Sequence, residues 1–446
     1  MNKFCRTTLI ALFLTFTLFA GTENLYAFID GVSGSSFNLT AKTGYISTPE
    51  GNSVFMWGFA LDTPTAFCPG GGCMQYPGPT FIVNQNAVVT ITLTNALAEP
   101  VSIVFPGQNV TATGGVPGLL TNEALPGGTV QYSFTASNPG TFTYYSGTNS
   151  SLQVEMGLAG TIIVRPTGYN EVDMDTYKAY GHSDSKFDRE YLFFLSEIDP
   201  NIHQLVEFGK MDMVDTTTFF PNYFFINGRN LPDTMADAYV DWLPSQPYNC
   251  MPMMHPDEKV LIRFVGGNRA SHPLHTHGNN HLVIARDGKL LESTPGAGAD
   301  LSVSDFTTTV YPGGTADAIW TWTGEKLGWD IYGHTDPTNT GKVGAACTAA
   351  GVPLQPGEYE PDHCKPIPVD LPDVLSLTYG PHYSGSPFLG QMGGLPPGSG
   401  GYNMFGGLFF MWHSHNEKEL TNYNIFIGGM GTMSVVLPPG APIMMP

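Results

Sequence analysis

Short stretches of alternating polar and apolar residues, separated by turn-forming residues, recur along this sequence. In the stretch 88–94, Val89, Ile91 and Leu93 share one side and threonines line the other, as in a strand with one buried face. The stretch 259–265 is more continuously apolar and predicts a more deeply buried strand. The 53 glycines and 36 prolines supply the turns between such stretches. The pattern predicts an all-β fold built from sandwiches or barrels.

The length of 446 residues allows two or three domains. Residues 167–186 are polar and lack a strand pattern, so we expect them to be a linker. A first domain is then expected at 28–166 and a larger second domain at 187–446. A Gly/Pro-rich stretch at 385–401 predicts a long loop in the second domain, which is either functional or disordered.

Residues 1–27 have the features of a secretory signal peptide. Lys3 and Arg6 supply its positive region, and an apolar run at 9–19 is followed by small residues. We therefore expect a secreted or periplasmic protein with no membrane span in the mature chain, although an uncleaved anchor is the alternative. The net charge of −20 repels phosphate backbones, so nucleic acid is not an expected partner.

Cysteine spacing predicts two disulfides in an oxidising compartment. Cys68 and Cys73 bracket a flexible Pro-Gly-Gly-Gly segment, and Cys347 and Cys364 flank a turn-rich loop. Cys250 is left over, and spacing alone does not decide the connectivity. It begins a Met-rich segment, 250–255, which is either a soft-ligand patch for Cu(I) or a Met-rich edge of the core.

Five of the twelve histidines lie in two short motifs, His-Pro-Leu-His-Thr-His-Gly at 272–278 and Trp-His-Ser-His at 412–415. Each motif contains two histidines two residues apart, and such residues project from the same face of a strand. Two such strands side by side would bring four imidazoles together, a good ligand set for copper, with zinc, nickel and iron as competitors. The alternative is a set of ordinary polar side chains on a wet strand. The predicted metal ligands are His272, His275, His277, His413 and His415.

These motifs resemble those of the multicopper oxidases. The first is similar to that family's His-Pro-x-His-x-His-Gly motif and the second to its C-terminal His-Cys-His motif. The stretches 76–83 and 125–132 are similar to the family's first domain, and 223–229 to a later domain. The resemblance implies two cupredoxin-like Greek-key β-sandwich domains, copper as the cofactor, and a small-molecule or metal-ion substrate.

The departures from the family pattern concern the copper ligands. Val-Phe-Pro-Gly at 104–107 and Tyr-Ser-Gly at 145–147 stand where the family's first domain carries its histidines. Ser414 replaces the thiolate of a blue copper site, and Glu419 replaces a histidine of that site. The resemblance then leaves His272 as the remaining ligand of the blue site, and it implies a histidine copper site in the second domain without a blue copper.

We therefore expect a copper-dependent oxidoreductase, and the alternative is a non-catalytic copper-binding or interaction protein. A homo-oligomer would not complete a larger copper cluster, because every first domain lacks the ligands. A hetero-complex with a histidine-bearing partner would. The sequence leaves both kinds of assembly open.

Overall fold

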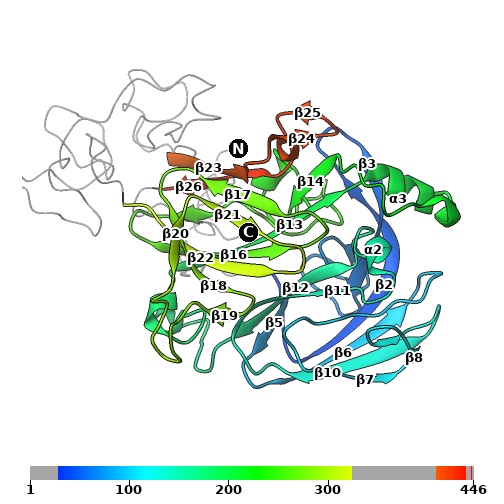
Figure 1. The fold of residues 1–446 in the computed structure, drawn as a ribbon, viewed down its shortest axis with the longest axis horizontal. Coiled ribbons are helices and arrows are strands. Elements are labelled where there is room, and N and C mark those ends of the chain that lie inside the picture. The colour runs from blue at the N-terminus through cyan, green and yellow to red at the C-terminus, as the bar shows by residue number, and fades with distance from the viewer. Residues whose placement is uncertain (1–28, 324–407, 438–442, 444–446) are drawn as a thin grey trace, which may run out of the picture.

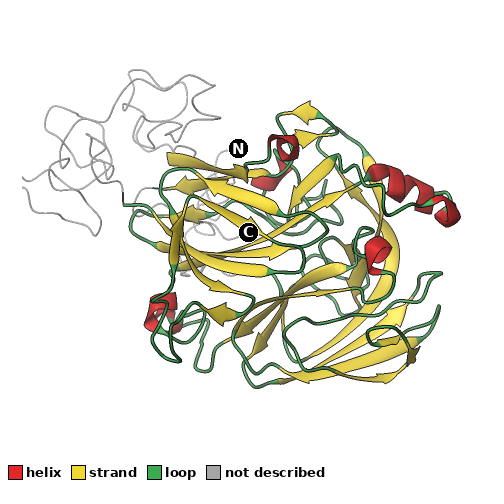
Figure 2. Ribbon diagram, in the orientation of Figure 1, coloured by secondary structure: helices red, strands yellow, loops and turns green. Residues whose placement is uncertain are grey.

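The computed structural model describes residues 29–323, 408–437 and 443, and they form two β-sandwiches (Figures 1 and 2). The prediction of an all-β fold is confirmed, because the helices are few and short. The predicted signal peptide, the Cys347–Cys364 pair and the loop at 385–401 lie outside the described residues. Among the described residues, no helix is long and apolar enough to cross a membrane.

The first sandwich pairs a six-stranded sheet, in the order β4-β3-β2-β6-β10-β7, with a four-stranded sheet, in the order β1-β5-β12-β11. Their strands are β1 (Val32–Ser33), β2 (Ser36–Ser47), β3 (Ser53–Leu61), β4 (Met74–Gln75), β5 (Phe81–Asn84), β6 (Val88–Asn95), β7 (Thr111–Gly114), β10 (Thr129–Thr135), β11 (Gly140–Tyr145) and β12 (Ala159–Arg165). A small separate ribbon is formed by β8 (Val116–Pro117) and β9 (Asn122–Glu123).

Alternation along β6 explains how the first core forms. Val89, Ile91 and Leu93 are buried, while the threonines between them are half-buried on the other face. The antiparallel partner β10 alternates in the same way and places Tyr132 opposite Ile91. Pairing these two strands buries one continuous apolar face against the four-stranded sheet.

The second sandwich pairs a seven-stranded sheet with a five-stranded one. The strands of the seven-stranded sheet are β13 (Arg189–Ile198), β14 (Tyr223–Ile226), β16 (Lys259–Gly266), β18 (His281–Arg286), β19 (Lys289–Leu290), β20 (Val303–Asp305) and β22 (Thr315–Thr321). The five-stranded sheet contains β15 (Met253–Met254), β26 (Gly431–Val436), β23 (Leu408–Ser414), β17 (His272–Thr276) and β21 (Thr307–Val310), in that spatial order. A two-stranded ribbon is formed by β24 (Thr421–Asn422) and β25 (Ile425–Phe426).

Within residues 29–323 and 408–437, helical turns lie in the connections between strands. They are α2 (Ser150–Gln153), α3 (Pro200–Glu207), and the 3₁₀ turns η1 (Met174–Thr176), η2 (Ser183–Ser185), η3 (Met211–Met213), η4 (Asp233–Met235) and η7 (Glu417–Leu420). The stretch 167–186, which we expected to be a polar linker, contains η1 and η2. Tyr177 and nearby Phe187 are buried against Leu261 and Ile284 of the second sandwich, whereas residues 170–175 are exposed, so part of this segment packs on the second sandwich.

One predicted disulfide is present, and it joins Cys68 and Cys73. Cys250 is the free cysteine of the described residues, and it is fully buried. Its thiol donates a hydrogen bond to the carbonyl of Ile226.

A buried group of charges connects the two sandwiches. Arg263 of β16 donates from Nε to Glu190 Oε2 at 2.9 Å and from Nη1 to the hydroxyl of Thr141, on β11 of the first sandwich, at 2.9 Å. Thr141 in turn donates to Asp317 at 2.7 Å, and Arg165 forms a second ion pair with Glu190. These charges are buried together, so each depends on its partners.

Replacing Arg263 with Ala should strongly destabilise the protein, because Glu190 and Asp317 would lose a buried cation. The expected loss is about 3–5 kcal/mol of unfolding free energy. Urea unfolding measures it. Lys186→Ala is the control, because its ion pair with Asp175 is exposed and is expected to contribute about 1 kcal/mol or less. Similar small losses in both variants would contradict the assigned role of Arg263.

Candidate metal centre

The pairing of β17 with β23 decides where the histidine motifs lie. The two strands are antiparallel, and His275 is directly opposite His413. Buried and half-buried side chains alternate along β17, and at the end of β23 the half-buried His413 lies between the buried Trp412 and Ser414. His275 and His413 therefore project from the same outer face of the five-stranded sheet, and His277 follows directly after the end of β17.

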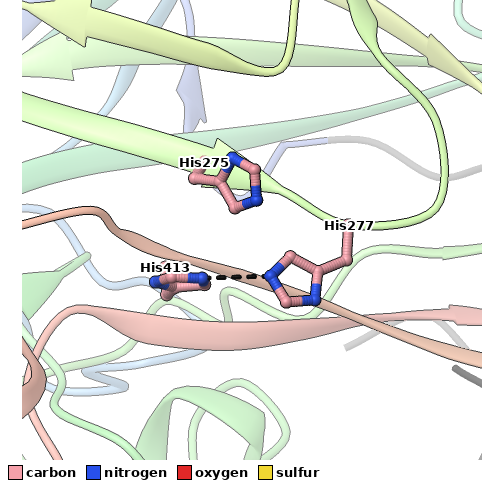
Figure 3. Close-up of side chains that lie close together, drawn as sticks. All are labelled: His275, His277 and His413. Atoms are coloured by element: carbon pink, nitrogen blue, oxygen red, sulfur yellow. Dashed lines mark hydrogen bonds between the residues drawn. The ribbon is translucent and has the colours of Figure 1, made fainter. Parts of the chain in front are cut away.

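Three imidazoles converge on this face (Figure 3). One ring nitrogen from each of His275, His277 and His413 lies within 4.8 Å of the others. The Nε2 atoms of His277 and His413 are 3.1 Å apart. Two imidazole nitrogens that bind one metal ion at about 2.0–2.1 Å would be separated by about 3 Å, so this spacing fits a shared ion.

Hydrogen bonds indicate which ring nitrogen of His275 and of His413 is available. Nδ1 of His413 is 2.8 Å from the carbonyl oxygen of Ser414, which only accepts, so Nδ1 carries the proton and Nε2 has the lone pair. Nδ1 of His275 is 2.9 Å from the hydroxyl of Thr307, which leaves Nε2 for a metal. Such partners orient a metal-binding imidazole. The sequence did not predict this role for Thr307. The one feature that marks it in the sequence is its place in a run of three threonines at 307–309.

Burial favours the neutral, metal-binding form of these imidazoles. It lowers the pKa of His413 to about 4, with neighbouring imidazoles adding to the effect and the hydrogen bond to Ser414 opposing it. Burial and the neighbouring imidazoles of His277 and His415 also lower the pKa of His275. Both rings are therefore uncharged at neutral pH, the form that binds metals.

His415 lies at the open side of the cluster. Its ring centroid is 5.0 Å from that of His275 and 5.6 Å from that of His413, and the side chain is exposed. Its backbone N–H donates to the carbonyl of Pro273 at 2.8 Å, which holds the segment beside β17. His415 is not among the three histidines whose ring nitrogens lie within 4.8 Å of one another.

His272 lies away from the cluster, on the inner face of β17. Its Nε2 is 2.9 Å from Glu197 Oε2 and its Nδ1 is 3.0 Å from Glu419 Oε2, and it is fully buried. Because both ring nitrogens are hydrogen bonded to carboxylates, His272 offers no lone pair in this arrangement, and we leave it out of the candidate ligand set. The sequence did not indicate that Glu197 would contact His272, since the two residues are 75 positions apart.

The residues 250–254, which could have been soft ligands for Cu(I), are instead part of the core. Burial raises the pKa of the Cys250 thiol to about 12, so it stays protonated. Met254 is buried in the core of the second sandwich, and Met251 and Met253 pack against Val435 and its neighbours. Cys250 and these methionines are thus engaged in core packing.

The first sandwich has apolar contacts where the resemblance would place copper ligands. Val104 exchanges both backbone hydrogen bonds with Tyr145. A Cβ atom on Gly147 would lie 2.7 Å from a methyl carbon of Val104, so these residues are closely packed. Phe105 is buried against Tyr132 and other rings of the core. Residues 28–166 contain no histidine.

Known proteins resemble this chain in part of its sequence and in its fold. Residues 73–168 match the family model described as multicopper oxidase. The structure also resembles a solved protein described as Multicopper Oxidase mgLAC, with a TM-score of 0.52 and 18% identity over 92% of this chain and 87% of that one. At that identity the likeness shows the fold alone. The chain therefore has a cupredoxin-like fold, and its residues 73–168 resemble the multicopper oxidases, proteins that bind copper.

Two relatives show which individual proteins the chain is similar to. It is 24% identical over 286 residues to copper resistance protein A of Escherichia coli, covering 57% of this chain and 44% of the relative. It is 31% identical over 126 residues to laccase 1 of Metarhizium robertsii, covering 26% of this chain and 20% of the relative. The chain thus spans less than half the length of these relatives.

The surroundings of His272 predict a pH-dependent stability. Burial lowers its pKa, but hydrogen bonds and charge from Glu197 and Glu419 outweigh this and raise it to about 9. At pH values below the unfolded-state pKa of about 6.5, the bound proton therefore stabilises the folded state by about 3 kcal/mol. This stabilisation is lost as the pH rises through 9. The unfolding free energy of wild type relative to His272→Gln should accordingly fall between about pH 6 and pH 10.

Urea unfolding of both proteins across this pH range measures the difference. His182→Gln is the control, because its side chain is partly exposed and bonded to Asp184 at the surface. A pH-independent difference between wild type and His272→Gln would contradict the assigned imidazolium.

Proposed function

We propose that this chain binds one copper ion through His275, His277 and His413, and that it is a copper-dependent oxidoreductase without a blue copper site. The observation that carries the proposal is the meeting of three imidazole nitrogens within 4.8 Å on one face of the second sandwich. Copper is favoured among the metals that imidazole binds because proteins of this family bind copper. We expect the protein to act outside the cytoplasm, as the N-terminal sequence predicts.

The residues around the cluster define what it can do. Thr307 orients the ring of His275, and the carbonyl of Ser414 sets the tautomer of His413. The exposed ring of His415 marks the side from which a small molecule reaches the cluster. A copper ion held there supplies single-electron chemistry by cycling between Cu(I) and Cu(II).

The side chain of Ser414 is the reason for proposing that no blue copper site is present. It is fully buried, and its oxygen accepts a hydrogen bond from the N–H of Asn416 at 3.1 Å. A hydroxyl does not supply the thiolate bond on which a blue site depends. The free cysteine of the described residues, Cys250, is committed to the core.

A second candidate is a non-catalytic copper-binding protein. This candidate is favoured by the packing of Val104 against Gly147, at the positions where the family's first domain carries copper ligands. The first sandwich then adds no copper ligand at these positions. A single copper stores one electron, whereas the reduction of dioxygen to water needs four. Turnover separates the two functions: the copper-loaded enzyme should oxidise a phenol or metal ion when peroxide is added as the electron acceptor, or reduce nitrite when an electron donor is added, and a carrier should not.

Copper binding itself has a direct test in His413→Ala. Wild-type protein should take up one Cu(II) per chain and give an electron paramagnetic resonance signal without intense blue colour. At free copper about a hundredfold above Kd, binding should add about 2.7 kcal/mol to the unfolding free energy. His413→Ala should lose most of this stabilisation, because it removes one of three ligands. Thermal unfolding with and without copper measures the change.

His255→Ala is the matched control for this experiment. His255 also lies in the second sandwich, but it bonds to Glu258 and is the last residue of the Met-rich segment 250–255. It should keep the wild-type response. Loss of copper binding in His255→Ala, with His413→Ala unaffected, would move the site to the methionine segment. A wild-type protein that stays metal-free in excess Cu(II) would overturn the proposal in favour of an interaction module.

A further inference from the structure

A buried ion triad lies on the inner face of the strand whose outer face carries part of the imidazole cluster. Its members are Glu197 from β13, His272 from β17 and Glu419 from η7. All three side chains are at most 2% exposed. Since β13 belongs to the seven-stranded sheet and β17 to the five-stranded sheet, the triad joins the two layers of the second sandwich.

The triad has a full set of hydrogen-bond partners. Both nitrogens of His272 face carboxylate oxygens, which only accept, so the ring donates twice as an imidazolium. Oε1 of Glu197 accepts from the backbone N–H of Arg269 at 3.0 Å and of Ala270 at 2.7 Å. Oε1 of Glu419 accepts from the amide of Asn416 at 3.1 Å. Buried charges are tolerated when they are paired and hydrogen bonded in this way.

Glu419 anchors the segment that follows the second histidine motif. Its backbone carbonyl accepts from the N–H of Met430 at 2.7 Å, and its carboxylate contacts both His272 and Asn416. The N–H of His415 bonds to Pro273, next to His272 on β17. The segment 413–420 is therefore tied to the same strand that carries His275.

We propose that the Glu197–His272–Glu419 triad is a positioning device, which holds the segment 413–420 against β17 and so sets the imidazoles of His413 and His415 before copper binds. Ligands that are already held in place lose less conformational entropy on binding and bind more tightly. The inference rests on the copper site proposed above. His272 and Glu419 act through other residues and do not touch the ion.

The test compares Glu419→Ala with Glu417→Ala, its matched control. Glu417 lies two residues away on the same 3₁₀ turn and is exposed. Glu419→Ala should weaken copper binding about tenfold or more, as loss of outer partners of a metal site does, which corresponds to about 1.4 kcal/mol. Its Cu(II) resonance spectrum should change as well. Glu417→Ala should match wild type in both.

Glu419→Gln provides the rescue. Its amide oxygen can still accept from His272, so its copper Kd should lie between those of wild type and Glu419→Ala. If Glu419→Ala does not fold, the same comparison is made with Glu419→Gln alone. A folded Glu419→Ala protein with wild-type Kd and resonance spectrum would overturn the proposal, and the triad would then support only the fold.

Hydrogen–deuterium exchange on the metal-free protein separates this proposal from the proposed function. Glu419→Ala should raise the exchange of backbone amides in 413–420, while Glu417→Ala should not. If wild-type protein binds no copper, the proposed function fails and exchange alone decides whether the triad holds the segment. Unchanged exchange in Glu419→Ala would overturn the positioning role in either case.

Discussion

The register between β17 and β23 is the constraint on which the candidate site depends. It places His275 opposite His413. His277 directly follows the last residue of β17, and its ring lies beside the other two. A slip of one residue would turn one of the two histidine motifs to the opposite face of the sheet, because side chains alternate along a strand. The register is held by a core of large rings, such as Trp412 and Phe410, on the buried face.

The two faces of this sheet have different chemistry. On the outer face the imidazoles of His275 and His413 are neutral and half-buried, as a metal requires. On the inner face the ring of His272 is charged and balanced by carboxylates. A strand with period two brings both environments together within four residues, which is why one motif contains histidines with different roles.

Much of the fold and part of the site could be predicted from local pattern. Alternation in 88–94 predicted β6, and the two pairs of histidines predicted which side chains would share a face. The carboxylate partners of His272 could not be predicted, because Glu197 is far away in the sequence and lies on the other sheet. The burial of Tyr177 in the expected linker was missed for the same reason, since its partners come from β16 and β18.

The most direct measurement is anomalous X-ray diffraction at the copper absorption edge, on crystals of the full chain soaked in Cu(II). We expect one strong peak on the outer face of the second sandwich, within bonding distance of the ring nitrogens of His275, His277 and His413. A peak at Cys250, a peak between His272 and Ser414, or no peak in the second sandwich would contradict it.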